Sequence, residues 1–281
     1  MPELPEVEYV ARQLRDMLIG RAILRADVSW PRAIATPDPA EFAARIAGQR
    51  VTHIARRGKY LLIGLDHGET LVVHRRMSGN LVLCAAGAEV AYARARFALD
   101  DGRALVYSDP RKFGRLALVA GDDLPAFFAA LGPEPLDDAF TPEVLAARLA
   151  GRARAIKALL LDQTVVAGLG NIYADEALFR ARLHPLRPGD SLSPDEIAAL
   201  RNAIQAALAT GIAHGGTTFG RHRDLYDEAG TNLDYIEVYR RTGQPCVRCG
   251  TPIERMVVAQ RGTHFCPHCQ PRAAARATGS R

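Results

Sequence analysis

The sequence predicts an α+β protein with a mostly β N-terminal domain and a mostly helical C-terminal domain. Between residues 51 and 119 the chain consists of short β-rich runs separated by Gly- and Asp-containing turns, as in a sandwich or a barrel. After residue 138 the apolar residues recur at three- and four-residue steps instead, which is typical of helices. Two Cys-x-x-Cys pairs near the C-terminus predict a metal-binding hairpin.

The composition is that of a globular protein. Of the 281 residues, 48% are hydrophobic and 24% are charged, which excludes a disordered or collagen-like chain. No apolar run approaches the ~20 residues that a membrane span needs. The opening MPELPEVEYV is acidic and interrupted by proline, unlike a secretory signal, so we expect a cytoplasmic protein that keeps its native N-terminus.

Positive charge is concentrated at the C-terminus. The 36 Lys and Arg exceed the 31 Asp and Glu by 5. Residues 240–281 hold eight Arg and one acid, a balance of +7, so the rest of the chain carries −2. The same segment contains four of the five cysteines, and clustered cysteines in a cytosolic chain are typically metal ligands rather than disulfides.

The N-terminal domain is expected to open with a helix, because apolar residues recur at helical spacing from Leu4 to Leu18 and Pro5 suits a first helical turn. A second, short helix is expected after Asp38, where Asp-Pro-Ala-Glu makes a capping box. The predicted strands then follow in the runs KYLLIGL, TLVVH, NLVLC, ARFAL, ALVY and RLALV.

The stretch LGPEPLDD at 131–138, with two prolines and a glycine, is the expected linker to the helical domain. Helices are predicted near Thr141-Pro142, through AIKALLLD, from an N-cap at Asn171, and from the capping box at 193–196 to Gly211, with a tight GLGN loop between the middle two. Residues 215–234 are expected to form a polar loop, and the tail after Arg272 to be disordered.

The cysteine spacing is the strongest single motif. Sixteen residues separate the two pairs, within the range of a four-thiolate zinc site, and the predicted ligands are Cys246, Cys249, Cys266 and Cys269. Thiolates at all four positions leave no place for water, so one structural Zn²⁺ is expected. Between the pairs, MVVAQ and THF would form a hairpin around Arg261-Gly262, with Arg261 near the tip as a phosphate ligand or as an ordinary turn arginine.

The N-terminus is a candidate nucleophile. If the initiator Met is removed, Pro2 presents a secondary α-amine, and such amines have a pKa of about 8, so a useful fraction is neutral at pH 7. A neutral amine can attack a carbon of glycosidic character and form an imine. Glu3 and Glu6 could act as acid or base beside it, or could simply be acids that favour a helix N-terminus.

Several motifs, in order along nearly the whole chain, resemble formamidopyrimidine-DNA glycosylases. They are MPELPEVE, RGKYLL, HRRMSG, SDPRKFG, LGPEPL, IKALLLDQTVVAGLGNIYADEALF and the terminal cysteine hairpin. The resemblance implies a bifunctional repair enzyme that removes oxidised purines, chiefly 8-oxoguanine and formamidopyrimidines, and then nicks the strand by β,δ-elimination. It also implies a β-sandwich in the N-terminal domain and a helix-two-turns-helix element in the C-terminal domain.

The resemblance assigns the catalytic roles residue by residue. Pro2 matches the family's nucleophile and Schiff-base former, and Glu3 the acid that protonates the sugar ring oxygen. Lys59 matches the lysine of β-elimination, although a surface lysine at a strand start is the alternative. Arg261 matches the arginine of δ-elimination and phosphate binding, and Glu6 remains a secondary catalytic candidate.

The resemblance also assigns DNA contacts. Met77, Arg111 and Phe113 match the family's intercalating trio, which fills the void left by an everted base, although Met77 and Phe113 could equally be core residues. Tyr92 stands at a further DNA-contact position. Asn171 and Lys157 would meet a phosphate at the helix-two-turns-helix element. The segment 217–234 stands where family members carry a mobile loop over the damaged base.

The expected organisation is a catalytic domain (1–132), a linker (133–138), a helical DNA-binding domain (139–239), a zinc finger (240–272) and a disordered tail (273–281), with DNA between the two main domains. We expect a monomer that acts on double-stranded DNA in a bacterial-type nucleoid and has no membrane partner. The alternatives are an endonuclease VIII-type enzyme for oxidised pyrimidines and a non-catalytic zinc-containing DNA-binding protein. The opening PELPE and the complete intercalating trio favour the purine enzyme.

Overall fold

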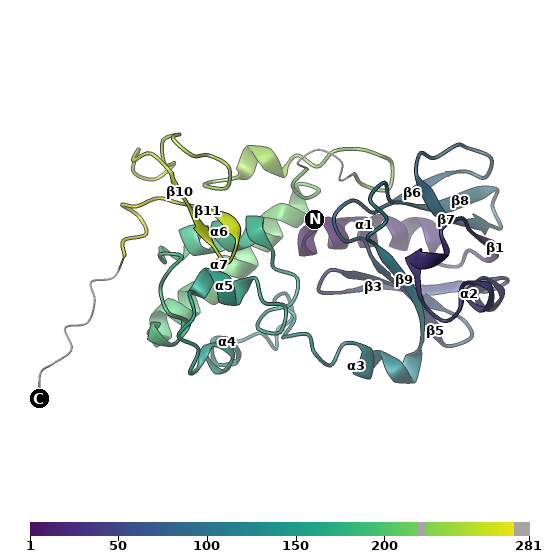
Figure 1. The fold of residues 1–281 in the computed structure, drawn as a ribbon, viewed down its shortest axis with the longest axis horizontal. Helices are drawn as coiled ribbons and strands as arrows, with labels where there is room; N and C mark the ends of the chain where they lie inside the picture. The colour runs from purple at the N-terminus through teal and green to yellow at the C-terminus, as the bar shows by residue number, and fades with distance from the viewer. Residues whose placement is uncertain (219–222, 273–281) are drawn as a thin grey trace, which may run out of the picture. The chain divides into compact units, whose positions relative to one another are not determined.

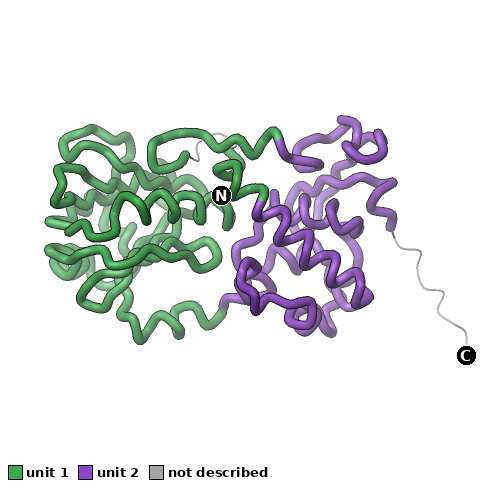
Figure 2. Tube along the Cα trace, turned by 180° about the vertical axis from the view of Figure 1, so that it is seen from behind, with its two compact units in different colours: residues 1–130, 210–234 green, residues 131–209, 235–281 purple. Residues whose placement is uncertain are grey.

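The computed structural model describes residues 1–218 and 223–272, which fall into two compact units (Figure 2). Unit 1 combines residues 1–130 with 210–234, and unit 2 combines residues 131–209 with the chain from Tyr235 onward. The α+β fold class is confirmed. One segment differs from the expected organisation, because residues 210–234 belong to unit 1 rather than to the helical domain. The predicted disordered tail, 273–281, lies outside the described residues.

Two β-sheets form unit 1 (Figure 1). A 4-stranded antiparallel sheet has the order β1-β7-β8-β6, and a 5-stranded sheet has the order β2-β9-β5-β4-β3, in which only β2 pairs in parallel. Every β-rich run named from the sequence lies on a strand. The bounds are β1 Ile23–Val28, β2 Ile34–Thr36, β3 Val51–Arg57, β4 Tyr60–Leu65, β5 Glu69–His74, β6 Asn80–Ala85, β7 Ala93–Leu99, β8 Arg103–Ser108 and β9 Arg115–Ala120.

The core of unit 1 takes side chains from both sheets and from two helices, α1 Leu4–Leu18 and α2 Pro39–Ile46. The apolar stripe of α1 is buried as its spacing predicts, and α2 buries Phe42 and Ile46. Asp38 caps α2 by accepting from the Ala40 N–H at 2.9 Å, whereas Glu41 pairs with Arg45 instead of completing a capping box.

A second apolar cluster covers the outer face of the 5-stranded sheet. It joins side chains of β5 and β9 to the short helix α3 Leu124–Phe127, which follows the 3-10 turn η2 Gly121–Asp123, and its buried members are Val72, Ala117 and Val119. Strand β5 is therefore buried along its whole length. Burial of both faces explains why three consecutive residues, Leu71, Val72 and Val73, are apolar rather than alternating with polar ones.

Unit 2 is mainly helical and ends in a hairpin. The helix predicted near Thr141-Pro142 is α4, and Thr141 caps it by accepting from the Val144 N–H at 3.4 Å. Ser193 and Glu196 form the predicted capping box of α7, which continues to Ala213, two residues beyond Gly211. The bounds are α4 Pro142–Leu149, α5 Ile156–Leu160, α6 Asn171–Arg180, η3 Gly189–Ser191, α7 Pro194–Ala213, β10 Glu254–Val258 and β11 Arg261–Phe265.

The expected linker is not a free connection. The Gly132 N–H donates to Gln163 O at 2.8 Å, Pro133 O accepts from Ala167 N–H at 3.0 Å, and Gln205 Nε2 donates to Pro135 O at 3.0 Å. Residues 131–138 therefore pack within unit 2. The connection between α5 and α6 is also longer than GLGN, since it spans residues 161–170. Among the described residues, no helix combines the length and the apolar character that crossing a membrane requires.

Candidate functional site

The N-terminus of unit 1 lies in a cluster of ionisable side chains. Pro2 is buried, and Glu3 and Lys59 are 4% and 6% exposed. With Met1 in place, burial lowers the pKa of the Met1 amine below its usual 8.0; Glu3 and Glu6 act to raise this pKa, and Lys59 acts to lower it. The structure therefore gathers the predicted catalytic residues of unit 1 around the N-terminus of the chain.

Glu6 orients this cluster. One of its carboxylate oxygens accepts from the Glu3 N–H at 2.7 Å, and the other accepts from the Thr217 N–H at 2.7 Å. Both oxygens thus hold buried backbone groups, one just before α1 and one after α7. This geometry suits a positioning role better than proton donation, the role that the sequence left open as a secondary possibility.

Lys59 occupies the turn between β3 and β4, next to the Arg57–Tyr60 strand pair. Arg56 steadies the turn, because its guanidinium donates to Gly58 O at 3.1 Å and to Glu8 Oε2 at 3.1 Å. The side chain of Lys59 is buried, so the alternative of an ordinary surface lysine is wrong. Its charge also helps burial and Arg76 to lower the pKa of His74 to about 4.

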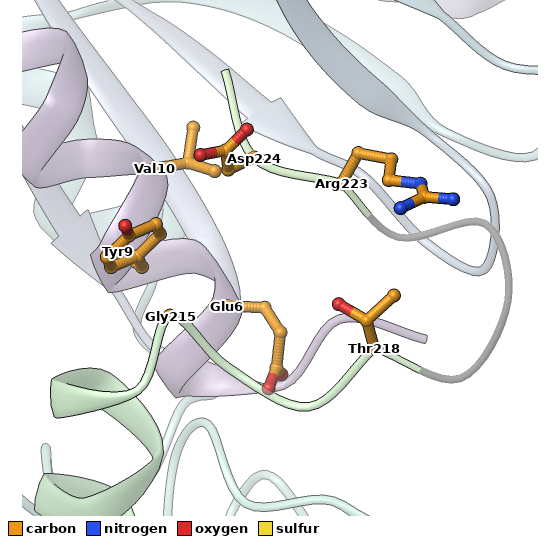
Figure 3. Close-up of a pocket in the computed structure, with 7 residues that line it drawn as sticks. All are labelled: Glu6, Tyr9, Val10, Gly215, Thr218, Arg223 and Asp224. Carbon is orange, nitrogen blue, oxygen red and sulfur yellow. The ribbon is translucent and has the colours of Figure 1, made fainter. Parts of the chain in front are cut away.

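A pocket opens beside Glu6 within unit 1 (Figure 3). It is open to solvent and is lined by Glu6, Tyr9, Val10, Gly215, Thr218, Arg223 and Asp224. The segment from Arg223 is anchored rather than loose: Asp224 accepts from Gln13 Nε2 at 2.7 Å, and the Leu83 N–H donates to Leu225 O at 3.1 Å. The described parts of the predicted 217–234 loop thus form one wall of this pocket.

The predicted intercalating residues lie on two exposed turns of unit 1. Met77 and Phe113 are 46% and 48% exposed, so the alternative of core residues is wrong. The guanidinium of Arg111 lies 4.7 Å from the centre of the Phe113 ring. Tyr92 is 59% exposed on a third turn. Large apolar side chains beside an arginine, displayed on turns, are suited to contacting bases.

Arg75 has a function that the sequence did not reveal. It is 2% exposed and donates to Gly79 O at 2.9 Å, to Asn80 Oδ1 at 2.6 Å and to Arg223 O at 3.1 Å. Burial lowers its pKa to about 10. Arg75 therefore supports the turn of Met77 from inside, and of the two arginines in HRRMSG only Arg76 is exposed. The Arg-Arg pair alone gave no signal of this difference.

In unit 2, the predicted phosphate contacts differ from expectation in two ways. Gly170, not Asn171, is the N-cap of α6, and Asn171 is its first residue. The Asn171 amide Nδ2 donates to Gly262 O at 2.9 Å, which ties α6 to the terminal hairpin. Arg261 is exposed near the tip of the hairpin, as predicted, but it is the first residue of β11, because the turn itself is formed by Ala259 and Gln260, both at positive φ.

Lys157 differs most clearly from its predicted role as a phosphate contact. It is fully buried, forms an ion pair with Asp175 and donates to Asn171 O at 3.1 Å. The predicted direct phosphate contact is therefore wrong, because this ammonium has no surface at which to meet DNA. Asp175 also accepts from the His264 N–H at 3.0 Å on β11. The pair thus joins α5, α6 and the hairpin that carries Arg261.

Asp175→Asn is expected to destabilise unit 2 by about 3–5 kcal/mol, because it leaves the Lys157 ammonium buried without a counter-ion. Hydrogen exchange of the amides of α5 and α6, resolved by mass spectrometry, measures the loss. The control is Arg154→Gln, which removes a pair with Asp162 whose N···O distance is 3.6 Å and whose arginine is 61% exposed. It should change stability by less than about 1 kcal/mol. Equal effects of the two variants would contradict the role assigned to the buried pair.

The four predicted cysteine ligands converge. Their Sγ atoms all lie within 4.8 Å of one another, with separations of 3.5 Å between Cys249 and Cys266 and 3.9 Å between Cys246 and Cys269. Thiolates around a tetrahedral Zn²⁺ at about 2.3 Å would be about 3.8 Å apart, so the set fits this ion. The Arg248 and Cys269 N–H groups point at Cys246 Sγ and Cys266 Sγ, each at 3.4 Å, and stabilise thiolate charge. The four thiolates form a structural zinc site.

Three family profiles match successive parts of the chain. They describe the formamidopyrimidine-DNA glycosylase N-terminal domain over residues 1–116, its H2TH domain over residues 131–222, and a zinc finger found in FPG and IleRS over residues 243–272. This chain belongs to the formamidopyrimidine-DNA glycosylase family. The three profiles follow the order of the structural elements, with the zinc-finger match containing all four cysteine ligands.

Curated relatives in the formamidopyrimidine-DNA glycosylase family match nearly the whole chain. The formamidopyrimidine-DNA glycosylases of Chloroflexus aggregans and of a Roseiflexus species are 53% and 52% identical over 96% of this chain and over 98% and 100% of their own lengths. Solved structures of the Lactococcus lactis enzyme agree in fold. Its complex with DNA containing an abasic site has a TM-score of 0.90 at 35% identity, covering 96% of this chain and 100% of the other.

Proposed function

We propose that this chain is a bifunctional DNA glycosylase and AP lyase that excises oxidised purines through an imine formed by Pro2. Membership of the formamidopyrimidine-DNA glycosylase family makes it a DNA glycosylase for oxidised or damaged bases. The observation that carries the proposal further is the burial of Pro2 together with Glu3, Glu6 and Lys59 at the N-terminus, where burial also lowers the pKa of the Met1 amine that precedes Pro2. DNA binding alone would need no such cluster.

The proposed chemistry takes the role of each residue from the family resemblance. Removal of Met1 exposes the Pro2 amine, which attacks the anomeric carbon of the damaged nucleoside as the bond to the base breaks. Glu3 protonates the sugar ring oxygen, so the ring opens and leaves an imine to Pro2. Lys59 is the proposed base of β-elimination, which releases the 3′ phosphate. Arg261 is assigned to δ-elimination and to the phosphate that departs with it.

The remaining proposed contacts hold the duplex. Met77 and Phe113 would fill the stack, and Arg111 would hydrogen-bond to the orphaned partner base. Tyr92, Asn171 and Arg261 would contact the backbone, Asn171 at the start of α6 where N–H groups favour an anion. Affinity resting on phosphates should fall as salt rises. We further propose that the chain acts as a monomer on bacterial nucleoid DNA. The proposed functional division is a catalytic domain at 1–132, a DNA-binding domain at 139–239, of which residues 210–234 pack in unit 1, and a zinc finger at 240–272.

The solved complexes of the relative support damaged-base DNA as the partner. The Lactococcus lactis enzyme has been crystallised with DNA containing Fapy-dG and with DNA containing an oxidised pyrimidine. The second complex keeps an oxidised pyrimidine as the alternative substrate. The opening PELPE and the exposed trio of Met77, Arg111 and Phe113 favour purines.

Borohydride trapping tests the proposal. A duplex with one 8-oxoguanine is incubated with the protein and borohydride, and mass spectrometry locates the covalent adduct. An adduct at Pro2 is expected, and a thymine glycol duplex should trap more slowly. Faster trapping on thymine glycol would overturn the purine assignment. No adduct on either duplex, with zinc bound and duplex affinity intact, would mean a non-catalytic DNA-binding protein.

A further inference from the structure

The two turns that carry the proposed intercalating residues both cross between the sheets of unit 1. Residues 75–79 connect β5 to β6, and residues 109–114 connect β8 to β9. Because β5 pairs with β9 and β6 pairs with β8, the two connections run side by side, bounded by the His74–Arg115 and Asn80–Ser108 strand pairs. Met77 lies on the first connection and Arg111 and Phe113 on the second.

A buried carboxylate fastens the two connections together. Asp109 is 1% exposed, and its oxygens accept from the N–H groups of Phe113 and Gly114, each at 2.8 Å, and of Arg111 at 3.2 Å. The same carboxylate accepts from the Ser78 hydroxyl of the other connection. One side chain thus fixes the backbone on either side of Phe113 and the residue next to Met77.

Tyr107 completes this arrangement. It is fully buried, and its hydroxyl donates to Asp109 Oδ2 at 3.4 Å. That hydroxyl lies between the connections: a Cβ at Gly79 would meet it at 2.5 Å, and a Cβ at Gly114 at 1.5 Å. Each connection therefore needs a glycine where it contacts Tyr107. The two glycines, the phenol and the carboxylate form a single packed unit, which we call the Asp109 clamp.

The third exposed turn is attached to the same residue by its main chain. The Asp109 N–H donates to Tyr92 O at 3.0 Å, and Arg94 Nε donates to Asp109 O at 2.8 Å. These bonds do not use the carboxylate. A change of the Asp109 side chain therefore loosens the two connections while leaving the main-chain attachment of the Tyr92 turn in place.

We propose that Asp109, with Tyr107, is a positioning residue that holds Met77, Arg111 and Phe113 in fixed positions relative to one another. Both connections would then enter the base stack together. The inference rests on the proposed function for the role of these three side chains. Opening a base step costs a few kcal/mol, and ordering free backbone costs roughly 1–2 kcal/mol per residue. Connections that are ordered before DNA arrives avoid the second cost.

The test compares Asp109→Asn with Ser108→Ala. The asparagine keeps the volume, but its NH₂ cannot accept the backbone N–H groups. Ser108 is the neighbouring residue, and its hydroxyl donates to Ala91 O at 2.6 Å, away from the clamp. Tyr107→Phe is a second clamp variant with the same core volume. Single-turnover excision is measured on a lesion duplex, and borohydride trapping on a single-stranded abasic oligonucleotide, which has no stack to open.

Asp109→Asn should slow excision from the duplex by about 100-fold, as expected when catalytic geometry shifts by about 1 Å. Trapping on the single strand should stay within twofold, Tyr107→Phe should follow Asp109→Asn in a weaker form, and Ser108→Ala should match the wild type on both substrates. Equal losses on both substrates would overturn the proposal, because they would mark a general structural defect. Wild-type excision from the duplex by Asp109→Asn would also overturn it.

Hydrogen exchange tests the Asp109 clamp independently of the excision reaction. In Asp109→Asn the amides of Phe113 and Gly114 should exchange faster, and so should the Gly79 amide, which donates to Arg75 O at 2.9 Å on the other connection. Faster exchange confined to residues 109–114 would show that the connections are not joined. If the wild-type protein failed to trap on any DNA, the proposed function would fall, while this exchange result would still decide whether the clamp exists.

Discussion

Replacing Glu3 by Gln is expected to slow base excision by about 10²- to 10⁴-fold while leaving lesion binding intact. Glu3 is buried and follows Pro2, whose amine we assign as nucleophile, and its proposed task is to protonate the sugar ring oxygen as the ring opens. A glutamine has the same shape but no proton to transfer. Single-turnover excision on an 8-oxoguanine duplex measures the effect, and a binding titration at fixed salt measures affinity.

The matched control for Glu3→Gln is Glu41→Gln. Glu41 lies on α2 and pairs with Arg45 at the surface, so it should retain wild-type excision. Glu6→Gln tests the positioning role of Glu6. A glutamine side chain has one oxygen, so it can accept only one of the two backbone N–H groups that Glu6 holds. Excision by Glu3→Gln within tenfold of wild type would remove Glu3 from the mechanism.

The second large effect is expected when the zinc ion is lost. Removing zinc with a chelator, or replacing Cys249 by Ser, is expected to unfold the segment 243–272 and to abolish tight DNA binding. The apolar cluster that supports this segment is small, with Phe179, Val238, Cys246, Ile253 and Cys266 as its buried members. Zinc contributes about 10–16 kcal/mol to the folding of zinc-finger peptides, far more than such a cluster supplies.

Metal analysis, circular dichroism and a DNA-binding titration on Cys249→Ser check this expectation. Cys84→Ser is the control, because Cys84 lies on β6 of unit 1, whereas the other four cysteines belong to unit 2, and its thiol donates to Ala104 O at 3.8 Å. The control should keep one zinc per chain and full affinity. A metal-free protein with unchanged DNA affinity would show that the hairpin does not depend on the ion.

Local patterns predicted most of the fold because they report local physics. The stripe from Leu4 to Leu18, the strand runs and the Ser193 capping box each depend on residues that are close together in the sequence, so each pattern predicts its element directly. The predictions that failed depended on distant partners. A lysine in AIKALLLD looks like a surface charge until Asp175, eighteen positions later, is placed against it. The hairpin turn was misplaced because Ala259 and Gln260 adopt positive φ without the glycine or asparagine that usually signals it.

The candidate site shows the same limit. Pro2, Glu3 and Lys59 could be identified from motifs, but the motifs did not predict that these residues are buried together. Their burial depends on the turn between β3 and β4 and on the segment at Thr217, which is more than 150 residues further along the chain. Asp109 belongs to the recognised motif SDPRKFG. The motif alone does not distinguish the buried residue that supports the turn from the exposed residues of the turn. That distinction appears only when Ser78 and Tyr107 are brought to the same carboxylate.

The division of unit 1 along the chain has a consequence for biosynthesis. The N-terminal residues are translated first, but Thr217 and Leu225, which hold Glu6 and complete the core around α1, are translated after α4, α5 and α6. A nascent chain therefore carries the proposed nucleophile on an unfinished surface until most of the protein has left the ribosome. Truncation at residue 130 would leave the same surface unfinished, so unit 1 is expected to need its C-terminal segment supplied in the same chain or added in trans.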